Sequence, residues 1–420
     1  MKLGFDISVI SEATSPLEIG IIDADLLDNG TRHPNLALLK ISGYCKDYSI
    51  HGIHHNVRLI CDYDEIRTSD RSAPKYDILA LSKVFKFTTI PDDISQMIED
   101  DEVYVGGTGF FEINGPVLPD VVEHHMPDYQ LYNEYIEKRT NGDPEIKKKR
   151  WDDYLNYSIG FTTRGCIRHC GFCVNRELNK VVEWSPVSEF FDDSRKRIYL
   201  WDDNIMAAPP AVFRKVISEL RDAGKPFQFR QGMDIRLMTD EKADVLKNAN
   251  YYGDYIFAFD HYRMDDPKEA KEVAETIRGL EIWRKHCLKS TKLYVLVGYD
   301  SQDEKDIEGT FFRIKTLMEF GCLPYIMRYE SYLTSEYKDM YIQIARWCNQ
   351  PNFYKKKSFR QYCVANEDYH KKLAKNPRGI CSSLKAMQRF EEKFPDIAAK
   401  YFDLRFDEVC KYDLLVKPNK

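Results

Sequence analysis

Residues 157–173, YSIGFTTRGCIRHCGFC, join a short apolar run to three closely spaced cysteines. The run YSIGF (157–161) has the length and composition of a buried strand. Cys166, Cys170 and Cys173 follow it within eight positions, whereas the other eight of the chain's 11 cysteines are isolated from one another. A strand that ends in such a loop is typical of an α/β fold that carries its chemistry at strand ends.

Strand-like apolar runs continue to alternate with helical stretches along the chain. Five further apolar runs follow, RIYLWD (197–202), FQFR (227–230), YIFAF (255–259), LYVLVG (293–298) and PYIMR (324–328). Apolar residues recur at helical spacing in three of the intervening stretches, 210–223, 268–286 and 303–320. Six strands with helices between them predict an α/β fold with a partial (βα)6 barrel of the TIM type over residues 156–335.

Flanking regions are expected on both sides of the barrel. Strand-like runs at 18–23, 57–60, 77–82 and 102–107, with a helical stripe over 34–48, predict a small open α/β domain of Rossmann-like type over residues 1–125. Turn signals and a basic run predict a linker over 126–155. Residues 336–420 are predicted to be a helical C-terminal extension. Its segment YKKKSFRQY (354–362) fits either a packed cap with solvated lysines or a nucleic-acid contact.

Composition excludes several classes of protein. The 420 residues carry 61 basic and 67 acidic side chains, so the net charge of −6 gives no chain-wide basic footprint for nucleic acid. No apolar run approaches the roughly 18 residues of a membrane span, and the N-terminus lacks the apolar core of a secretory signal. An odd number of cysteines without such a signal argues against a disulfide framework. We therefore expect a cytoplasmic protein without membrane contact.

The cysteine triplet could hold metal in two ways. Structural zinc takes four protein ligands, and His169 is a conceivable fourth, although its position next to Cys170 makes one closed tetrahedron awkward. A 4Fe-4S cluster takes one cysteine per iron, so three cysteines leave one iron open to a substrate or cofactor. A non-catalytic zinc or iron–sulfur module and a catalytic cluster are both compatible with these residues.

Polar groups at the ends of the predicted strands favour a catalytic site. The six strands end in Thr162-Thr163-Arg164, Asp202-Asp203-Asn204, Arg230-Gln231, Asp260-His261, Gly298 with Asp300, and Arg328 with Glu330. In βα barrels the active site lies at the C-terminal ends of the strands. Turns alone would need only small or permissive residues at these places.

The spacing Cys-x3-Cys-x2-Cys, with Phe172 before the third cysteine, resembles the radical S-adenosylmethionine (SAM) superfamily. The form RGC…C-x-F-C is most similar to the branch of cobalamin-domain enzymes and methylthiotransferases. Residues 23–44, 324–329 and 345–349 resemble bacterial and phage members. This resemblance implies that Cys166, Cys170 and Cys173 hold a 4Fe-4S cluster whose open iron binds SAM. It also implies that an electron from a flavodoxin or ferredoxin cleaves SAM to a 5′-deoxyadenosyl radical, which abstracts hydrogen from a substrate.

The resemblance also assigns SAM contacts residue by residue. Phe172 matches the aromatic residue whose backbone meets the adenine. Asp202, Asp203 and Asn204 stand where many members have the Gly-Gly-Glu that holds the amine of SAM. The further candidates are Gln231, Asp234 and Arg236 for the carboxylate or ribose, Asp260 for the ribose, and Gly298 for close approach of the backbone to adenine. For Asp234, a role in a turn or at a helix terminus is an equal alternative.

The region 1–125 stands where that branch has its cobalamin-binding domain. The usual signature, Asp-x-His-x-x-Gly, has no match there, since His33 comes too late after Asp28. Some members bind cobalamin without this His, so a cobalamin-dependent methyltransferase is an alternative to a degenerate domain kept for packing or substrate recognition. Only Cys45 and Cys61 precede the triplet, which disfavours methylthiolation. We expect a radical modification without cobalamin, on a small molecule, a peptide or RNA.

Two other groups of possible metal ligands give weaker signals. Cys348, Cys363, Cys381 and Cys410 are too widely spaced for the usual pattern of a second cluster, and cysteine is often simply a small buried apolar residue. The histidines of HGIHH (51–55) are expected to lie in a solvated turn.

Overall fold

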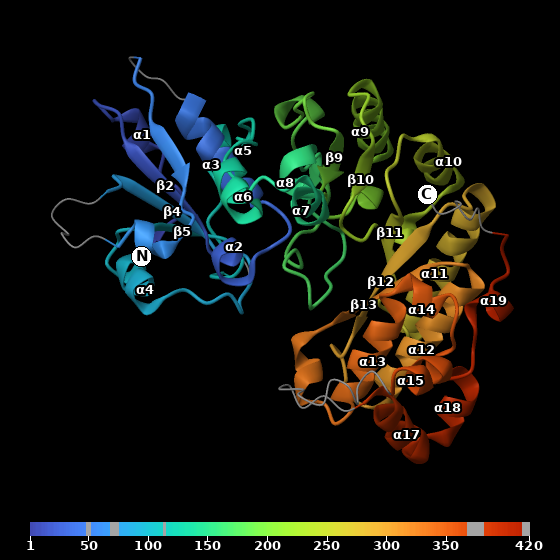
Figure 1. The fold of residues 1–420 in the computed structure, drawn as a ribbon. Helices are drawn as coiled ribbons and strands as arrows, with labels where there is room; N and C mark the ends of the chain where they lie inside the picture. The colour runs from blue at the N-terminus through green and yellow to red at the C-terminus, as the bar shows by residue number, and fades with distance from the viewer. Residues whose placement is uncertain (48–51, 68–74, 112–114, 368–381, 414–420) are drawn as a thin grey trace. The chain divides into compact units, whose positions relative to one another are not determined.

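The structure is a computed structural model that describes residues 1–47, 52–67, 75–111, 115–367 and 382–413 (Figure 1). The chain divides into two compact units, residues 1–202 with 214–227, and residues 203–213 with 228–420. Both units combine parallel strands with helices, so the expected mixed α/β class is confirmed. In the part of the chain that the structure describes, no helix is both long and apolar enough to cross a bilayer.

A five-stranded sheet, with strand order β1-β5-β4-β2-β3, opens the first unit. Its pairs are parallel, and its strands are β1 (Lys2–Leu3), β2 (Glu18–Asp23), β3 (Asn56–Leu59), β4 (Ile78–Ser82) and β5 (Tyr104–Gly106). Buried residues fill nearly all of β2 and all of β4, as in central strands covered on both faces. The four strands predicted in this region are therefore present, and the two-residue β1 was not predicted.

Helices cover both faces of this sheet. Because successive strand residues point to opposite faces, Ile21 packs in one apolar cluster and Ile22 in the other. α3 (Leu36–Asp47) contributes to the first cluster, and α4 (Asp92–Glu99) contributes to the second. The other short helices of this region are α1 (Ser8–Ser11), α2 (Ala24–Asn29) and α5 (Asp120–Glu123).

Residues 126–155, predicted as a linker, contain helices α6 (Asn133–Thr140), α7 (Pro144–Arg150) and α8 (Asp152–Asn156). Their apolar side chains join the first cluster of the sheet, where Tyr132 and Trp151 are almost fully buried. The turn signals act as helix boundaries, since Asn141 ends α6 in the left-handed conformation and Asp143 caps α7. The segment is therefore part of the core of the first unit.

The six strands predicted for the barrel are all present. β6 (Tyr157–Gly160), β9 (Arg197–Leu200) and β10 (Phe227–Phe229) form a sheet in the order β10-β9-β6, whereas β11 (Tyr255–Ala258), β12 (Thr291–Val297) and β13 (Leu323–Arg328) form another in chain order. The predicted helices are present as α9 (Pro210–Asp222), α11 (Pro267–His286) and α12 (Glu304–Glu319), joined by α10 (Asp240–Asn248). The six strands lie in two separate three-stranded sheets, and their arrangement as a partial barrel stays a prediction.

The described residues of the predicted C-terminal extension are mainly helical. Its described helices are α13 (Lys338–Cys348), α14 (Pro351–Tyr354), α15 (Phe359–Ala365), α17 (Ser383–Lys393), α18 (Pro395–Tyr401) and α19 (Phe406–Val409). In the basic and aromatic segment 354–362, Tyr354 and Phe359 are fully buried, and Arg360 pairs with Glu391 at 2.8 Å. The aromatic residues of this segment are therefore part of the hydrophobic core, whereas its lysines are partly or fully exposed to solvent.

Candidate functional site

The loop that carries the three cysteines is closed at its base by a short antiparallel ladder. β7 (Thr163–Arg164) pairs with β8 (Val182–Glu183), so the chain leaves and returns at the same place directly after β6. Gly165 begins the loop with a φ of +103°, and a Cβ there would lie 2.1 Å from the carbonyl oxygen of Lys180. Only glycine fits this turn.

The side chains of Cys166, Cys170 and Cys173 are half-buried. The backbone N–H of Arg168 donates to the Cys166 sulfur at 3.3 Å, and that of Asn175 donates to the Cys173 sulfur at 3.4 Å. Hydrogen bonds of this kind stabilise thiolates and tune the potential of iron–sulfur clusters. As a donor set, three thiols on one loop with N–H groups directed at two of them fit a 4Fe-4S cluster.

His169 does not complete a site for one metal ion with these thiols. Its Nδ1 lies 2.7 Å from the carbonyl oxygen of Arg176, and its side chain is exposed. Among all described residues, no three His, Cys, Asp or Glu side chains are grouped so that they could hold a single ion. The contact of His169 with Arg176 therefore argues against His169 as a fourth zinc ligand.

Neither of the weaker signals yields a site in the described residues. In HGIHH, the Nδ1 of His55 accepts the backbone N–H of Leu17 at 3.2 Å, whereas His51 lies outside the described residues. Cys348 and Cys363 are buried, and burial raises the pKa of both thiols. Cys381 also lies outside the described residues.

Asp202 is buried at the end of β9, where it fixes the residues that lead into the cysteine loop. Its carboxylate accepts the backbone N–H groups of Thr162 and Thr163 at 3.1 and 2.6 Å, and their hydroxyls at 2.5 and 2.7 Å. Burial raises the pKa of Asp202, and these four hydrogen bonds oppose that rise. Asp202, the predicted acceptor for the SAM amine, is thus already hydrogen-bonded to Thr162 and Thr163.

The neighbouring candidates belong to the second unit. Asp203 is half-exposed, whereas Asn204 is buried at the start of the turn η3 (Ile205–Ala207). Gln231, after β10, is exposed. Asp203 and Gln231 are the more accessible polar candidates in this group.

Asp234 and Arg236 form part of an internal ion-pair chain. The Nε of Arg236 lies 2.6 Å from Asp234, and its Nη1 lies 2.7 Å from Glu272. Asp234 also caps the turn η4 (Ile235–Leu237) by accepting the backbone N–H of Arg236 at 3.2 Å. For Asp234, this geometry favours a role in the turn over a contact with SAM.

Asp260 and Gly298 are held by contacts at the ends of β11 and β12. Asp260 accepts the backbone N–H of Leu296 at 3.1 Å, which ties the end of β11 to β12. Gly298 has a φ of +72°, and its N–H donates to the buried Asp306 at 2.7 Å. A Cβ at Gly298 would lie 2.9 Å from the Cβ of Tyr332, so packing within the chain already accounts for this glycine.

An aromatic and cationic group, of which the sequence predicted only Arg164 as a strand-end residue, gathers where β6 and β9 end. Trp201 packs edge-on against Phe161 and His33, with ring centroids 6.3 and 6.5 Å away. The guanidinium of Arg164 lies 4.0 Å from the ring centroid of Phe161. His33, which pairs with Asp153, comes from a loop of the first sheet, far away in sequence. Its approach to Trp201 is a long-range contact for which the sequence offered no signal.

Buried carboxylates make hydrogen bonds at the carboxyl edge of the first sheet. In doubly wound sheets, ligands bind where the strand order reverses, which here lies between β2 and β4. Asp25 accepts the backbone N–H groups of Val84 and Phe85 at 2.6 and 3.2 Å, which draws the segment after β4 across this point. Asp23 accepts the Tyr132 hydroxyl at 2.8 Å, and burial raises its pKa to about 6.

Comparisons with known proteins give only distant likenesses. No protein-family profile and no curated protein matches the chain. Solved structures of the cobalamin-dependent S-adenosylmethionine radical enzyme OxsB match 94% of the chain at 12–13% identity, with TM-scores of 0.31 to 0.32. They include the apo form, a form with aqua-cobalamin, and a form with aqua-cobalamin and S-adenosylmethionine. The chain covers 58% of the length of that enzyme, and at this similarity the likeness carries no conclusion about function.

Proposed function

We propose that this protein is a radical SAM enzyme in which Cys166, Cys170 and Cys173 hold a 4Fe-4S cluster. The observation that supports this most strongly is the placement of three cysteines on one loop, which β7 and β8 close directly after a parallel strand. When bound, such a cluster supplies the electron that reductively cleaves SAM to a 5′-deoxyadenosyl radical, which takes hydrogen from a substrate. A cytoplasmic flavodoxin or ferredoxin would be the reductant.

The chain's own residues have distinct tasks in this proposal. The N–H groups of Arg168 and Asn175 stabilise two of the thiolates, and Gly165 lets the loop close. Asp202 acts as a positioning residue because it fixes Thr162 and Thr163, directly before the loop. Phe172 on the loop stays the predicted contact for the adenine of SAM.

Anaerobic reconstitution with iron and sulfide tests the metal assignment. We expect about four irons and four sulfides per chain, with visible absorbance, and a large loss of both in Cys173→Ala. Cys61→Ala is the matched control, since Cys61 is also a half-buried cysteine and lies outside the loop, so its loss should leave the iron content unchanged. One zinc per chain without visible absorbance would assign the site to the non-catalytic alternative.

Cobalamin-dependent methyl transfer is the alternative within the same class. It would need a cofactor site in the first unit, where Asp23 and Asp25 at the carboxyl edge of the sheet are engaged by Tyr132 and Val84. These contacts favour a domain used for packing or substrate recognition. Turnover assays with and without cobalamin, with S-adenosylhomocysteine as the second product measured, separate the two reactions. Production of S-adenosylhomocysteine only in the presence of cobalamin would select methyl transfer.

A further inference from the structure

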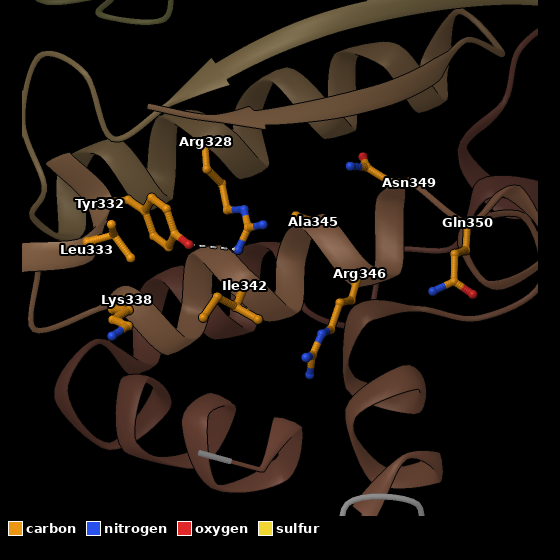
Figure 2. A pocket seen from close by; sticks show the side chains of 9 residues that line it. All are labelled: Arg328, Tyr332, Leu333, Lys338, Ile342, Ala345, Arg346, Asn349 and Gln350. Carbon is orange, nitrogen blue, oxygen red and sulfur yellow. Dashed lines mark hydrogen bonds between the residues drawn. The ribbon is translucent and has the colours of Figure 1, made fainter. Parts of the chain in front are cut away.

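A cavity of about 420 Å³ lies between the C-terminal end of β13, the turn η5 (Glu330–Thr334) and α13, all within the second unit (Figure 2). This volume falls within the range of small-molecule sites, roughly 300–1,000 Å³. Tyr332 lines the cavity and also packs against Gly298 at the end of β12. The cavity therefore lies at the strand ends, where α/β enzymes commonly bind ligands.

The charged side chains that line this cavity are all cationic. Arg328, Lys338 and Arg346 line it, and no Asp or Glu of the described chain does so. None of these three cations forms an ion pair with a carboxylate of the described residues. A second cavity is different, because Glu336 and Asp339 balance its basic residues, and Lys393 pairs with Glu336 at 2.6 Å. The uncompensated positive charge is therefore a property of the first cavity.

The cations are presented by rigid elements. Lys338, Ile342 and Arg346 are spaced i, i+4 and i+8, which places them on one face of α13 over about 12 Å. Arg328 reaches this face from β13, and its Nη1 donates to the Tyr332 hydroxyl at 3.2 Å (Figure 2). The amide of Asn349 bonds the backbone of Ile326 at 2.7 and 3.1 Å, so α13 is fixed against the edge of β13.

We propose that this cavity binds a phosphate ester of small-molecule size. Arginine and lysine supply the charged donors that phosphate oxygens accept. Leu333, Ile342 and Ala345 give the same cavity an apolar wall for the organic part of the ligand. The three cations line a single cavity and do not form a long basic stripe. This arrangement favours a small ester over a nucleic acid strand. That this ester is the substrate of the radical chemistry rests on the function proposed above.

Calorimetric titration of the full-length chain with phenyl phosphate tests the inference, with phenol as the uncharged counterpart. We expect saturable binding of one phenyl phosphate per chain, weakened by added salt, and no binding of phenol. Lys338→Ala and Arg346→Ala should each weaken binding roughly tenfold, the worth of one charged hydrogen bond. Arg346→Lys should retain part of the affinity. Arg389→Ala is the matched control from the second cavity and should bind like the wild type.

Three results would overturn the inference. One is the absence of phenyl phosphate binding, and another is an equal loss of binding in Arg389→Ala. The third is tight binding of a single-stranded RNA through Lys338 and Arg346 without binding of phenyl phosphate, which would assign the surface to nucleic acid. None of these measurements needs the iron–sulfur cluster. Failure of the radical reaction and failure of this site are therefore distinguishable.

Discussion

Asp202 accepts both the backbone N–H and the hydroxyl of Thr163, at 2.6 and 2.7 Å, and so joins the end of β9 to the residue two positions before Gly165. Thr162 makes the same pair of bonds to the same carboxylate. The strand end from which the cysteine loop emerges is thereby fixed by one buried side chain. We therefore expect the conformation of the cysteine loop to depend on this carboxylate.

Replacing Asp202 should loosen the loop. Asp202→Asn keeps the size of the side chain but leaves one acceptor oxygen and adds two donors that face the Thr162 and Thr163 donors. We expect an unfolding free energy lower by about 2–4 kcal/mol, because buried donors lose their acceptor. Urea denaturation measures that loss, and iron content after reconstitution should fall with it. Asp222→Asn, at an exposed position, should change neither. Full iron uptake and stability in Asp202→Asn would contradict this role.

Gly165→Ala should prevent loop closure. The new Cβ would meet the Lys180 carbonyl oxygen at 2.1 Å, and φ is +103° at this position. Gly224→Ala is a matched control, because Gly224 also has a positive φ of +70° but has no other atom within 4 Å of the place that a Cβ would take. We expect Gly165→Ala to lose most of its bound iron. The control should keep its iron and lose only about 1 kcal/mol of stability. Equal behaviour of the two variants in iron analysis would contradict the steric argument.

The buried Asp23 should make stability depend on pH. Burial raises its pKa to about 6, above the value of about 3.9 for an exposed aspartate. The folded state therefore binds the proton more tightly, and the contribution of Asp23 to the unfolding free energy rises as the pH falls from 7 to 4. The rise amounts to at most about 3 kcal/mol.

Comparison of the wild type with Asp23→Asn isolates this effect. The wild-type value minus the variant value of the unfolding free energy should be larger at about pH 4.5 than at about pH 7.5, as the linkage relation requires. Asp28→Asn is the control, since hydrogen bonds from Thr89 lower the pKa of the exposed Asp28, so that its contribution is lost only below about pH 4 and should change little between pH 7.5 and pH 4.5. A difference for Asp23→Asn that does not change with pH would contradict the shift.

The sequence predicted the regular elements well where apolar patterning was strong. Each of the six strands from 157 to 328 was expected, since each is a short, largely apolar run, and the strands from β6 to β11 are buried almost throughout. The ladder of β7 and β8 was missed because two-residue strands carry no periodicity. The helices of 126–155 were missed because residues that cap helices, such as Asn141 and Asp143, are also typical of turns in linkers.

The candidate site was predicted unevenly for a physical reason. The cysteine loop is local, so spacing alone revealed it. The partners of Asp202 and Asp234 depend on how distant segments fold together, and the structure gives both carboxylates partners within the protein. The cavity lined by Arg328, Lys338 and Arg346 was not predicted either, because β13 and α13 form it jointly. Its helical half could have been found from the i, i+8 spacing of Lys338 and Arg346.

Formation of 5′-deoxyadenosine is the sharpest test of the proposed radical chemistry. The reconstituted protein, reduced with dithionite in the absence of oxygen, is given SAM, and the product is quantified by liquid chromatography and mass spectrometry. We predict 5′-deoxyadenosine from the wild type and from Cys61→Ala, and none from Cys173→Ala. Unchanged product formation by Cys173→Ala, or none from a wild-type protein that holds its iron, would contradict the proposed function.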